Sequence, residues 1–283
     1  PKAPHSLAVV PGPASATVSW VPGNDGSART TSYTVTSDPG GITATVNGST
    51  NSATVTGLDP ATTYTFTVTA KSAAGTSLPS APTSAITPIV GSELAVLQPA
   101  SINYGSPLAV SAVLRRKDTA AGIAGQQVAI FRRGPGSTTW VARGTATTGS
   151  DGSVEFKLHP TRTIQVKLVY QGADGFKSVN ETTTTTVHYV VAAALSAGSV
   201  RHGGYVKLTG SVSPALAGLE VTRQQLVGGK WQDGPSKAIG QDGAFSWRLH
   251  PMRRKTTLTY RVVIGASHGL GAGTSPTLIL DVR

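Results

Sequence analysis

The chain has 283 residues, of which 13% are charged and none is cysteine, and its formal net charge is +11. Without cysteine it has no disulfide framework, thiolate metal site or cysteine nucleophile, and no apolar run approaches the roughly 20 residues that a membrane helix needs. The length allows two or three domains, and the abundance of Ala, Ser, Thr, Gly and Val favours strands separated by turns.

The first part of the chain contains short alternating segments. Residues 62–70 read TTYTFTVTA, so that Tyr64, Phe66 and Val68 point one way and the threonines the other. This alternation is typical of a half-buried antiparallel strand. Residues 16–20 and 33–36 alternate in the same way, with Gly, Asn and Asp between them. Several short strands at this spacing predict a β-sandwich.

The same residues carry a family resemblance that covers about 1–88. Trp20 on an early strand, Tyr33 on the next, and the run GLDPATTY at 57–64 resemble a fibronectin type III domain. The resemblance implies that Tyr64 forms a tyrosine corner, with its hydroxyl bonded to backbone upstream. The Arg-Gly-Asp motif of some members is missing, because the corresponding loop at 71–76 reads KSAAGT. The resemblance therefore implies an architecture and no particular partner.

The rest of the chain contains an internal repeat at an offset of 91 residues. The identical pairs are Trp140 and Trp231, Asp151 and Asp242, Gly152 and Gly243, Leu158 and Leu249, His159 and His250, and Pro160 and Pro251. We expect each repeat to open with an alternating strand, near 107–113 and 205–210. A period of this length made of short strands indicates tandem sandwiches rather than a solenoid.

These patterns predict an all-β fold of three tandem immunoglobulin-like antiparallel β-sandwiches. Prolines at 79, 82 and 88 mark an exit from the first one, because proline is restricted to edges and turns of sheets. The expected domains are 1–88, fibronectin type III-like, and 89–188 and 189–283, the two immunoglobulin-like repeats. The repeats resemble the immunoglobulin-like modules of secreted proteins from high-GC Gram-positive bacteria, which implies a secreted or cell-surface location.

Two repeated residue types are candidate sites. Trp140 and Trp231 are candidates for stacking against sugars, but their recurrence at one framework position favours packing within a hairpin or core. His159 and His250 each lie between Leu and Pro, where we expect the imidazole to bond to backbone. The other histidines show no close ligand spacing, so no metal site is predicted.

No catalytic constellation is evident in the sequence. The 13 acidic residues are scattered, several of them in Asp-Gly turns, whereas acid–base catalysis needs positioned pairs. No nucleophile elbow, phosphate-binding loop or calcium-binding ladder occurs. We therefore predict that the chain is not an enzyme and binds no cofactor.

Basic residues are unevenly distributed. The net charge is about 0 over 1–88, +4 over 89–188 and +7 over 189–283. Three clusters stand out, and together they form the candidate anion-binding set: Arg115, Arg116 and Lys117; Arg132 and Arg133; Arg253, Arg254 and Lys255. They either keep the surface soluble and its edges unpaired or contact an anionic cell-wall polymer or glycan. No aromatic residues are interleaved with the basic residues of the clusters, which argues against nucleic acid.

The sequence leaves three functions open. The first is a non-catalytic extracellular binding or spacer array for adhesion or surface attachment. The second is the accessory arm of a secreted polysaccharide or peptidoglycan hydrolase. The third is a subunit of a phage virion or surface filament, whose partners would be other protein subunits.

Overall fold

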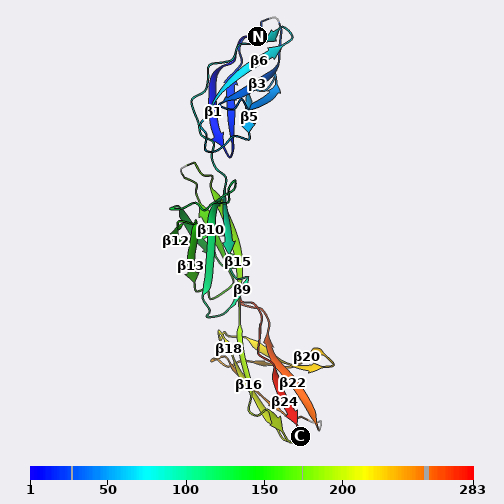
Figure 1. Cartoon of the computed structure of the whole chain (residues 1–283). Coiled ribbons are helices and arrows are strands. Elements are labelled where there is room, and N and C mark those ends of the chain that lie inside the picture. The colour runs from blue at the N-terminus through cyan, green and yellow to red at the C-terminus, as the bar shows by residue number, and fades with distance from the viewer. Residues whose placement is uncertain (27, 174, 252–254) are drawn as a thin grey trace.

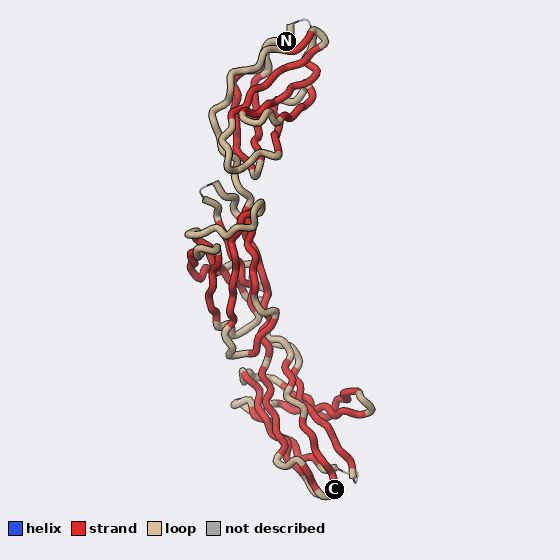
Figure 2. The backbone as a smooth tube through the Cα atoms, in the orientation of Figure 1, coloured by secondary structure: helices blue, strands red, loops and turns tan. Residues whose placement is uncertain are grey.

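The computed structural model describes residues 1–26, 28–173, 175–251 and 255–283. Over these ranges the regular structure consists of strands, and the predicted fold of tandem immunoglobulin-like sandwiches is confirmed (Figures 1 and 2). A helix with the length and hydropathy of a membrane span does not occur in the described part of the chain. Figure 1 shows the sandwiches following one another end to end.

The first unit comprises strands β1 to β7. Their bounds are β1 His5–Gly12, β2 Ser15–Val21, β3 Thr30–Asp38, β4 Thr43–Asn47, β5 Ser52–Thr56, β6 Thr65–Ser72 and β7 Gly75–Thr76. They form one sheet in the order β1-β2-β5 and another in the order β4-β3-β6-β7. Between the sheets Trp20 packs on Tyr33 with ring centroids 5.2 Å apart. Tyr64, Phe66 and Val68 are buried, as the alternation predicts.

The second unit comprises strands β8 to β15. Their bounds are β8 Ser92–Leu97, β9 Ser101–Asn103, β10 Leu108–Arg116, β11 Gln127–Arg133, β12 Val141–Thr147, β13 Ser153–Leu158, β14 Ile164–Tyr170 and β15 Val179–His188. One sheet has the order β13-β10-β8 and the other the order β12-β11-β14-β15-β9. The strands pair antiparallel, except that the short β9 pairs parallel with β15.

The third unit comprises strands β16 to β24. Their bounds are β16 Val190–Leu195, β17 Ser199–Val200, β18 Val206–Ser213, β19 Glu220–Val227, β20 Lys230–Ala238, β21 Ala244–Leu249, β22 Thr256–Ile264, β23 Gly273–Thr274 and β24 Leu278–Val282. One sheet has the order β16-β18-β21 and the other β17-β24-β22-β19-β20, with β23 paired to β22. Figure 1 shows the β20 hairpin projecting sideways from this unit.

The second and third units share one topology. Strands β8, β10 and β13 correspond to β16, β18 and β21, and β9, β11, β12, β14 and β15 correspond to β17, β19, β20, β22 and β24. Trp140 immediately precedes β12, and Trp231 is the second residue of β20. The repeated tryptophans therefore occupy equivalent edge hairpins.

The Asp-Gly turns are also equivalent. Gly152 and Gly243 have φ angles of 80° and 81°, a region that favours glycine. The carboxylates of Asp151 and Asp242 each accept a backbone N–H two residues on, both at 3.0 Å. The turns thus use the Asp as a local cap and the Gly for its conformation.

The opening strands of the repeats were only partly predicted. Each unit begins with a strand that the alternation did not reveal, β8 in one and β16 in the other, before the expected strands β10 and β18. The segment 190–195 reads VVAAAL and the segment 92–97 reads SELAVL, and neither alternates clearly between polar and apolar residues. Their strand identity comes from pairing with β18 and β10.

Buried apolar side chains of the described residues form three clusters, one in each unit. The third cluster begins with Val187, which lies near the end of β15 of the second unit. Ile102 on β9 packs against both the second and the third cluster. The boundaries at 88 and 188 stay predictions. The cores of the second and third units meet near the boundary at 188.

Candidate functional site: basic surfaces and unit junctions

The cluster Arg115, Arg116 and Lys117 lies at the end of the second unit that faces the first. Arg115 is paired with Glu93 at 3.2 Å, and Arg116 with Asp118 at 2.7 Å. Hydrogen bonding from Arg116 lowers the pKa of Asp118 to about 2. Two of the three cations are therefore already balanced by carboxylates of this chain.

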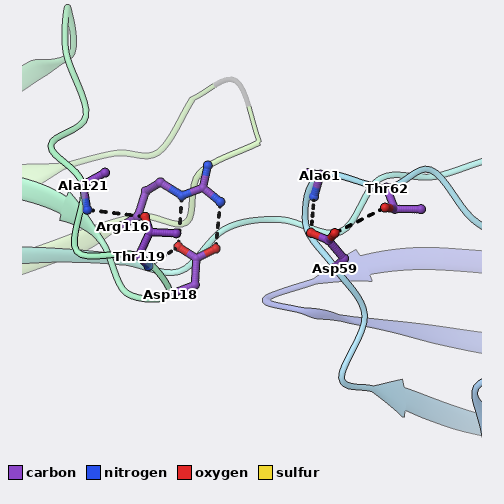
Figure 3. A network of polar contacts seen from close by, with 7 residues as sticks. All are labelled: Asp59, Ala61, Thr62, Arg116, Asp118, Thr119 and Ala121. Carbon is purple, nitrogen blue, oxygen red and sulfur yellow. Dashed lines mark hydrogen bonds and ion pairs between the residues drawn. The ribbon is translucent and has the colours of Figure 1, made fainter.

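Arg116 also faces an acidic loop of the first unit. Figure 3 shows the Arg116 and Asp118 pair on one side of the junction and Asp59 on the other. The hydrogen bond to Asp118 is the main cause of the raised pKa of Arg116, and the charges of Asp118 and Asp59 add to it. Asp59 is held in place by the N–H of Ala61, which donates to its Oδ1 at 2.9 Å. This cluster is thus part of a unit junction.

Backbone hydrogen bonds lock the first junction. The N–H of Ile89 donates to the carbonyl of Gly12 in the first unit at 3.0 Å. The next residue, Val90, donates to the carbonyl of Gly175 in the second unit at 2.7 Å, and its own carbonyl accepts from Lys177 at 2.9 Å. Consecutive residues are therefore held by different units, and no free linker separates them.

The second junction is held in the same way. Tyr189 alone separates β15 from β16, and it is 2% exposed. Its N–H donates to the carbonyl of Gly271 at 3.1 Å, and the N–H of Gly271 donates to Val187 at 2.8 Å. A further bond joins the N–H of Thr163 in the second unit to the carbonyl of Gly269 in the third, at 2.8 Å. The chain passes between the units as part of a packed core.

The repeated tryptophans are half-buried and covered by arginine. The guanidinium of Arg133 lies 4.4 Å from the Trp140 ring centroid, and the ammonium of Lys167 lies 5.7 Å from it. Arg133 Nε also donates to Gln165 Oε1 at 2.6 Å. One face of the indole is therefore occupied by cations, which supports hairpin packing over an open sugar platform.

The third unit repeats this arrangement with the strands exchanged. Arg261 lies 4.2 Å from the Trp231 ring centroid and donates through Nε to Gln224 Oε1 at 2.6 Å. Gln224 on β19 pairs with Arg261 on β22, whereas in the second unit the arginine is on β11 and the glutamine, Gln165, is on β14. The two units thus form the same contact between Arg, Gln and Trp, but the arginine and the glutamine have exchanged strands.

Arg132 lines a hollow at the end of the second unit that faces the third. Its lining includes Arg133, Pro160, Arg162 and the hydroxyl residue Thr161, and it encloses about 250 Å³. Arg132 follows Val128 and Ile130 in the inward-facing register of β11 and is half-buried. The predicted pair Arg132 and Arg133 therefore shares this hollow with Arg162, which the sequence did not indicate.

A hollow of about 520 Å³ occupies the equivalent position in the third unit. Its lining is rich in basic, polar and aromatic side chains: Arg223, Gln225, Pro235, Trp247, Arg248, Leu249, His250, Pro251, Leu258 and Tyr260. Arg223 lies 91 residues after Arg132 in the sequence, at the same repeat position. Its Nε is buried and has no hydrogen-bond partner among the described residues.

Tyr260 forms the inner wall of this hollow. The guanidinium of Arg223 lies 5.5 Å from its ring centroid. Burial raises the pKa of the Tyr260 phenol, and the charge of Arg223 opposes that shift. The wall thus combines a neutral aromatic face with a cation that leans over it.

The expectation that the histidines of the two Leu-His-Pro segments bond to backbone is wrong. Both are exposed, and neither His159 nor His250 forms a hydrogen bond with the described residues. His250 instead packs against Tyr205, with ring centroids 5.9 Å apart. The Arg248 guanidinium lies 5.1 Å from the Tyr205 ring. Because Tyr205 is 57% exposed, this trio extends the rim of the hollow to the surface.

Of the remaining predicted residues, Arg253 and Arg254 lie outside the described residues. Lys255 is exposed and has a φ of 47°. Among the described residues no three His, Asp or Glu side chains gather in a way that could hold a metal ion. Arg162, Arg223, Arg248 and Trp247 were missed as site residues, although the offset of 91 from Arg132 could have identified Arg223.

No curated protein sequence matches the chain. Solved structures similar to it include the FN1–FN3 domains of chicken CNTN1 at 15% identity and TM-score 0.30, covering 100% of this chain and 99% of that one. A tetra-tandem repeat from the extending region of a large adhesion protein has 16% identity and TM-score 0.32, covering 95% and 70%. The native conformation of E. coli alpha-2-macroglobulin has 10% identity and TM-score 0.34, covering 100% and 23%. Residues 2–86 match the family model of the fibronectin type III domain, which is the family that the first unit resembles in sequence.

Proposed function

We propose that this chain is a non-catalytic spacer and binding array that acts outside the cell, in adhesion or surface attachment. The observation that carries the proposal is the way in which the units are joined. Ile89 and Val90 are hydrogen-bonded to different units, and Tyr189 is buried between β15 and β16. Such joints favour a stiff rod that holds its two ends apart.

The junctions restrict the relative orientations of the units. A flexible linker would let the units adopt many relative orientations and would bring the chain ends closer on average. Here each junction residue has its backbone donors or acceptors engaged by a folded unit, and freeing them would expose polar groups and part of a core. The junctions therefore favour one arrangement over a broad ensemble.

The two later units add the binding part of the proposal. Their shared strand order and repeated Trp, Asp-Gly and Leu-His-Pro framework support duplication of one module. We assign them to the bacterial immunoglobulin-like modules of secreted proteins, which gives an extracellular or surface location. Their net charges of about +4 and +7 suit an anionic cell-wall polymer as partner.

Small-angle X-ray scattering tests the spacer function. We expect the full chain to scatter as an extended rod whose maximum dimension matches the structure. A variant with Gly-Ser-Gly-Ser inserted between Pro88 and Ile89 serves as the flexible control, and its scattering should indicate a wider range of shapes. A wild-type chain that scatters as a compact or flexible particle contradicts the proposal.

An activity screen tests the non-catalytic part. The purified chain should hydrolyse glycan, peptide and ester substrates no faster than a buffer control. Reproducible turnover that is lost on substitution of a single Asp, Glu or His would show that the chain is an enzyme.

A further inference from the structure

We propose that the hollow around Arg223 binds the acidic group of an anionic sugar polymer, and that the hollow around Arg132 is its counterpart in the preceding repeat. The inference deepens the proposed function and rests on it for the presence of such a polymer outside the cell. It names two specific sites in place of the clusters of charge that the sequence suggested.

The burial of Arg223 points to an anionic ligand. Its side chain lines the hollow together with Trp247 and Leu249 from the facing sheet, and its Nε is buried without a hydrogen-bond partner in the described part of the chain. Buried donors are rarely left without an acceptor. A carboxylate or phosphate oxygen in the hollow would supply one, in a charge-assisted bond that is stronger than a neutral bond.

The guanidinium of Arg223 is closely packed by its neighbours. The guanidinium of Arg223 lies 5.5 Å from the centroid of the Tyr260 ring, and Gly234 on β20 also lies close to it. A Cβ at position 234 would lie 2.9 Å from the carbonyl oxygen of Arg223 and 3.5 Å from its Nε. Because the guanidinium is packed close to both an aromatic ring and the backbone of a glycine, it has little freedom to lose when a ligand binds.

The charge of the residues that line the hollows favours an anion. None of the residues that line the two hollows is acidic. The ion pairs of the described residues involve Arg115 and Arg116 only. Asp233, the acidic residue of β20, instead accepts a bond from Gln224 at 2.7 Å. No carboxylate of the described residues therefore neutralises the cations of the hollows, and these cations attract an anion.

The lining of the Arg223 hollow also suits a sugar. Trp247 lines the Arg223 hollow and is half-buried, and an indole face suits the apolar face of a pyranose. Gln225 and His250 offer hydrogen bonds for hydroxyl groups, and Tyr205 and Arg248 extend the rim. The volume of about 520 Å³ lies in the range of small-ligand sites. An acidic pyranose matches this combination of one ring platform and several cations.

Both of the later units carry a hollow of this kind. Arg132 and Arg223 occupy the same repeat position, and each hollow is also lined by the proline of its Leu-His-Pro segment, Pro160 or Pro251. A polymer presents the same acidic group many times, so two equivalent sites on one rod can be occupied by one molecule. The second-unit hollow has no aromatic residue in its lining and adds Arg162 and hydroxyls instead. We expect it to contribute an oxyanion contact without ring stacking.

The test measures binding of the full chain to three probes at a fixed ionic strength, by calorimetry. The probes are oligogalacturonate, which carries carboxylates on pyranose rings, poly(glycerol phosphate), which carries phosphates without rings, and neutral maltohexaose. The variants are Arg223→Gln and Arg132→Gln, with Lys230→Gln and Lys157→Gln as controls of equal charge at exposed positions outside both hollows. Trp247→Phe separates ring stacking from charge.

We expect oligogalacturonate to bind and maltohexaose not to bind. Arg223→Gln should weaken binding at least about tenfold, the usual scale for a lost charge-assisted contact, while each lysine variant changes it less than about twofold. Trp247→Phe should weaken binding of oligogalacturonate more than that of poly(glycerol phosphate). If only the phosphate polymer binds through Arg223, the assignment to a sugar polymer is overturned, because that polymer has no pyranose ring.

Two controls keep the result unambiguous. The Nε–H signals of ¹⁵N-labelled arginine report on Arg223 directly, and one of them should shift on titration with oligogalacturonate and be missing in Arg223→Gln. Equal losses in Arg223→Gln and Lys230→Gln, or binding of maltohexaose at the same affinity, would overturn the proposal. Scattering from the same samples reports on the rod shape separately, so that the spacer function and this site can fail independently.

Discussion

The backbone N–H of Asp59 donates a hydrogen bond to the hydroxyl oxygen of Tyr64, 3.0 Å away. Tyr64 is 5% exposed and belongs to the core of the first unit. The bond ties the loop at 57–62 to the start of β6, and it confirms the tyrosine corner that the sequence resemblance implies. The same loop carries Asp59 towards the second unit, so the corner also shapes the first junction.

Tyr64→Phe removes this bond and keeps the ring. We expect it to lower the free energy of unfolding of the first unit by about 1 kcal/mol, the net value of one hydrogen bond. Tyr64→Ala should lower it by about 3 kcal/mol or more, because a large cavity is created. Urea unfolding of the full chain, followed through the indole NMR signal of Trp20, measures both. No loss in either variant would refute the corner.

The exchanged Arg and Gln positions predict a rescue. Arg133→Gln should destabilise the second unit by about 1 kcal/mol, because both the contact with Trp140 and the bond to Gln165 are lost. The double variant Arg133→Gln with Gln165→Arg reproduces the arrangement of the third unit and should recover most of the loss. A double-mutant cycle from urea unfolding gives the coupling. Additive losses would show that the two positions are not interchangeable.

The Asp-Gly turns predict a contrast between glycines. A Cβ at Gly152 would lie 2.3 Å from the carbonyl oxygen of Leu114, whereas a Cβ at Gly125 has open space around it. Both have positive φ, 80° and 70°. Gly125→Ala should therefore cost about 1 kcal/mol for the backbone conformation alone, and Gly152→Ala about 3 kcal/mol or more through the added clash. Thermal unfolding of the two variants measures the loss of stability in each. Equal losses in Gly125→Ala and Gly152→Ala would contradict the close packing of Gly152 against Leu114.

The pKa of the Asp118 carboxyl should depend on Arg116. Its pKa is lowered to about 2 by the hydrogen bond from that guanidinium. Because the pKa is lower in the folded state, the ion pair stabilises the protein fully at pH values above 3.8, the ordinary pKa of the carboxyl. This contribution disappears as the pH falls towards 2. Arg116→Gln should return the pKa towards 3.8 in an NMR titration. Asp151, whose pKa is lowered by Ser153, is the internal control and should not change.

The sequence predicts the sandwich class and the repeated framework because these depend on local patterns. Alternation at 62–70 and the spacing of Trp140, Asp151 and Pro160 from their counterparts are visible without a structure. The opening strands β8 and β16 are not visible, because their strand identity depends on long-range pairing. The candidate site shows the same limit, since Arg223 belongs to no charge cluster and acquires its role only when the fold turns it inward.

The junctions could not be predicted for a related reason. The prolines near 88 indicated an exit from the first unit, which is the pattern of a linker as much as of a joint. Only the register of Ile89 and Val90 against two different units shows that the joint is closed. Likewise, no local signal marks Tyr189 as the buried point between β15 and β16.

The distribution of distances between the first and third units tests the central claim most directly. The chain lacks cysteine, so Thr45→Cys and Lys207→Cys, both at exposed positions, allow spin labels to be placed specifically for pulsed electron paramagnetic resonance. We predict a single narrow distribution for the otherwise unchanged chain, and a broad one when Gly-Ser-Gly-Ser is inserted between Pro88 and Ile89. A distribution as broad without the insertion as with it would contradict the account of a stiff rod.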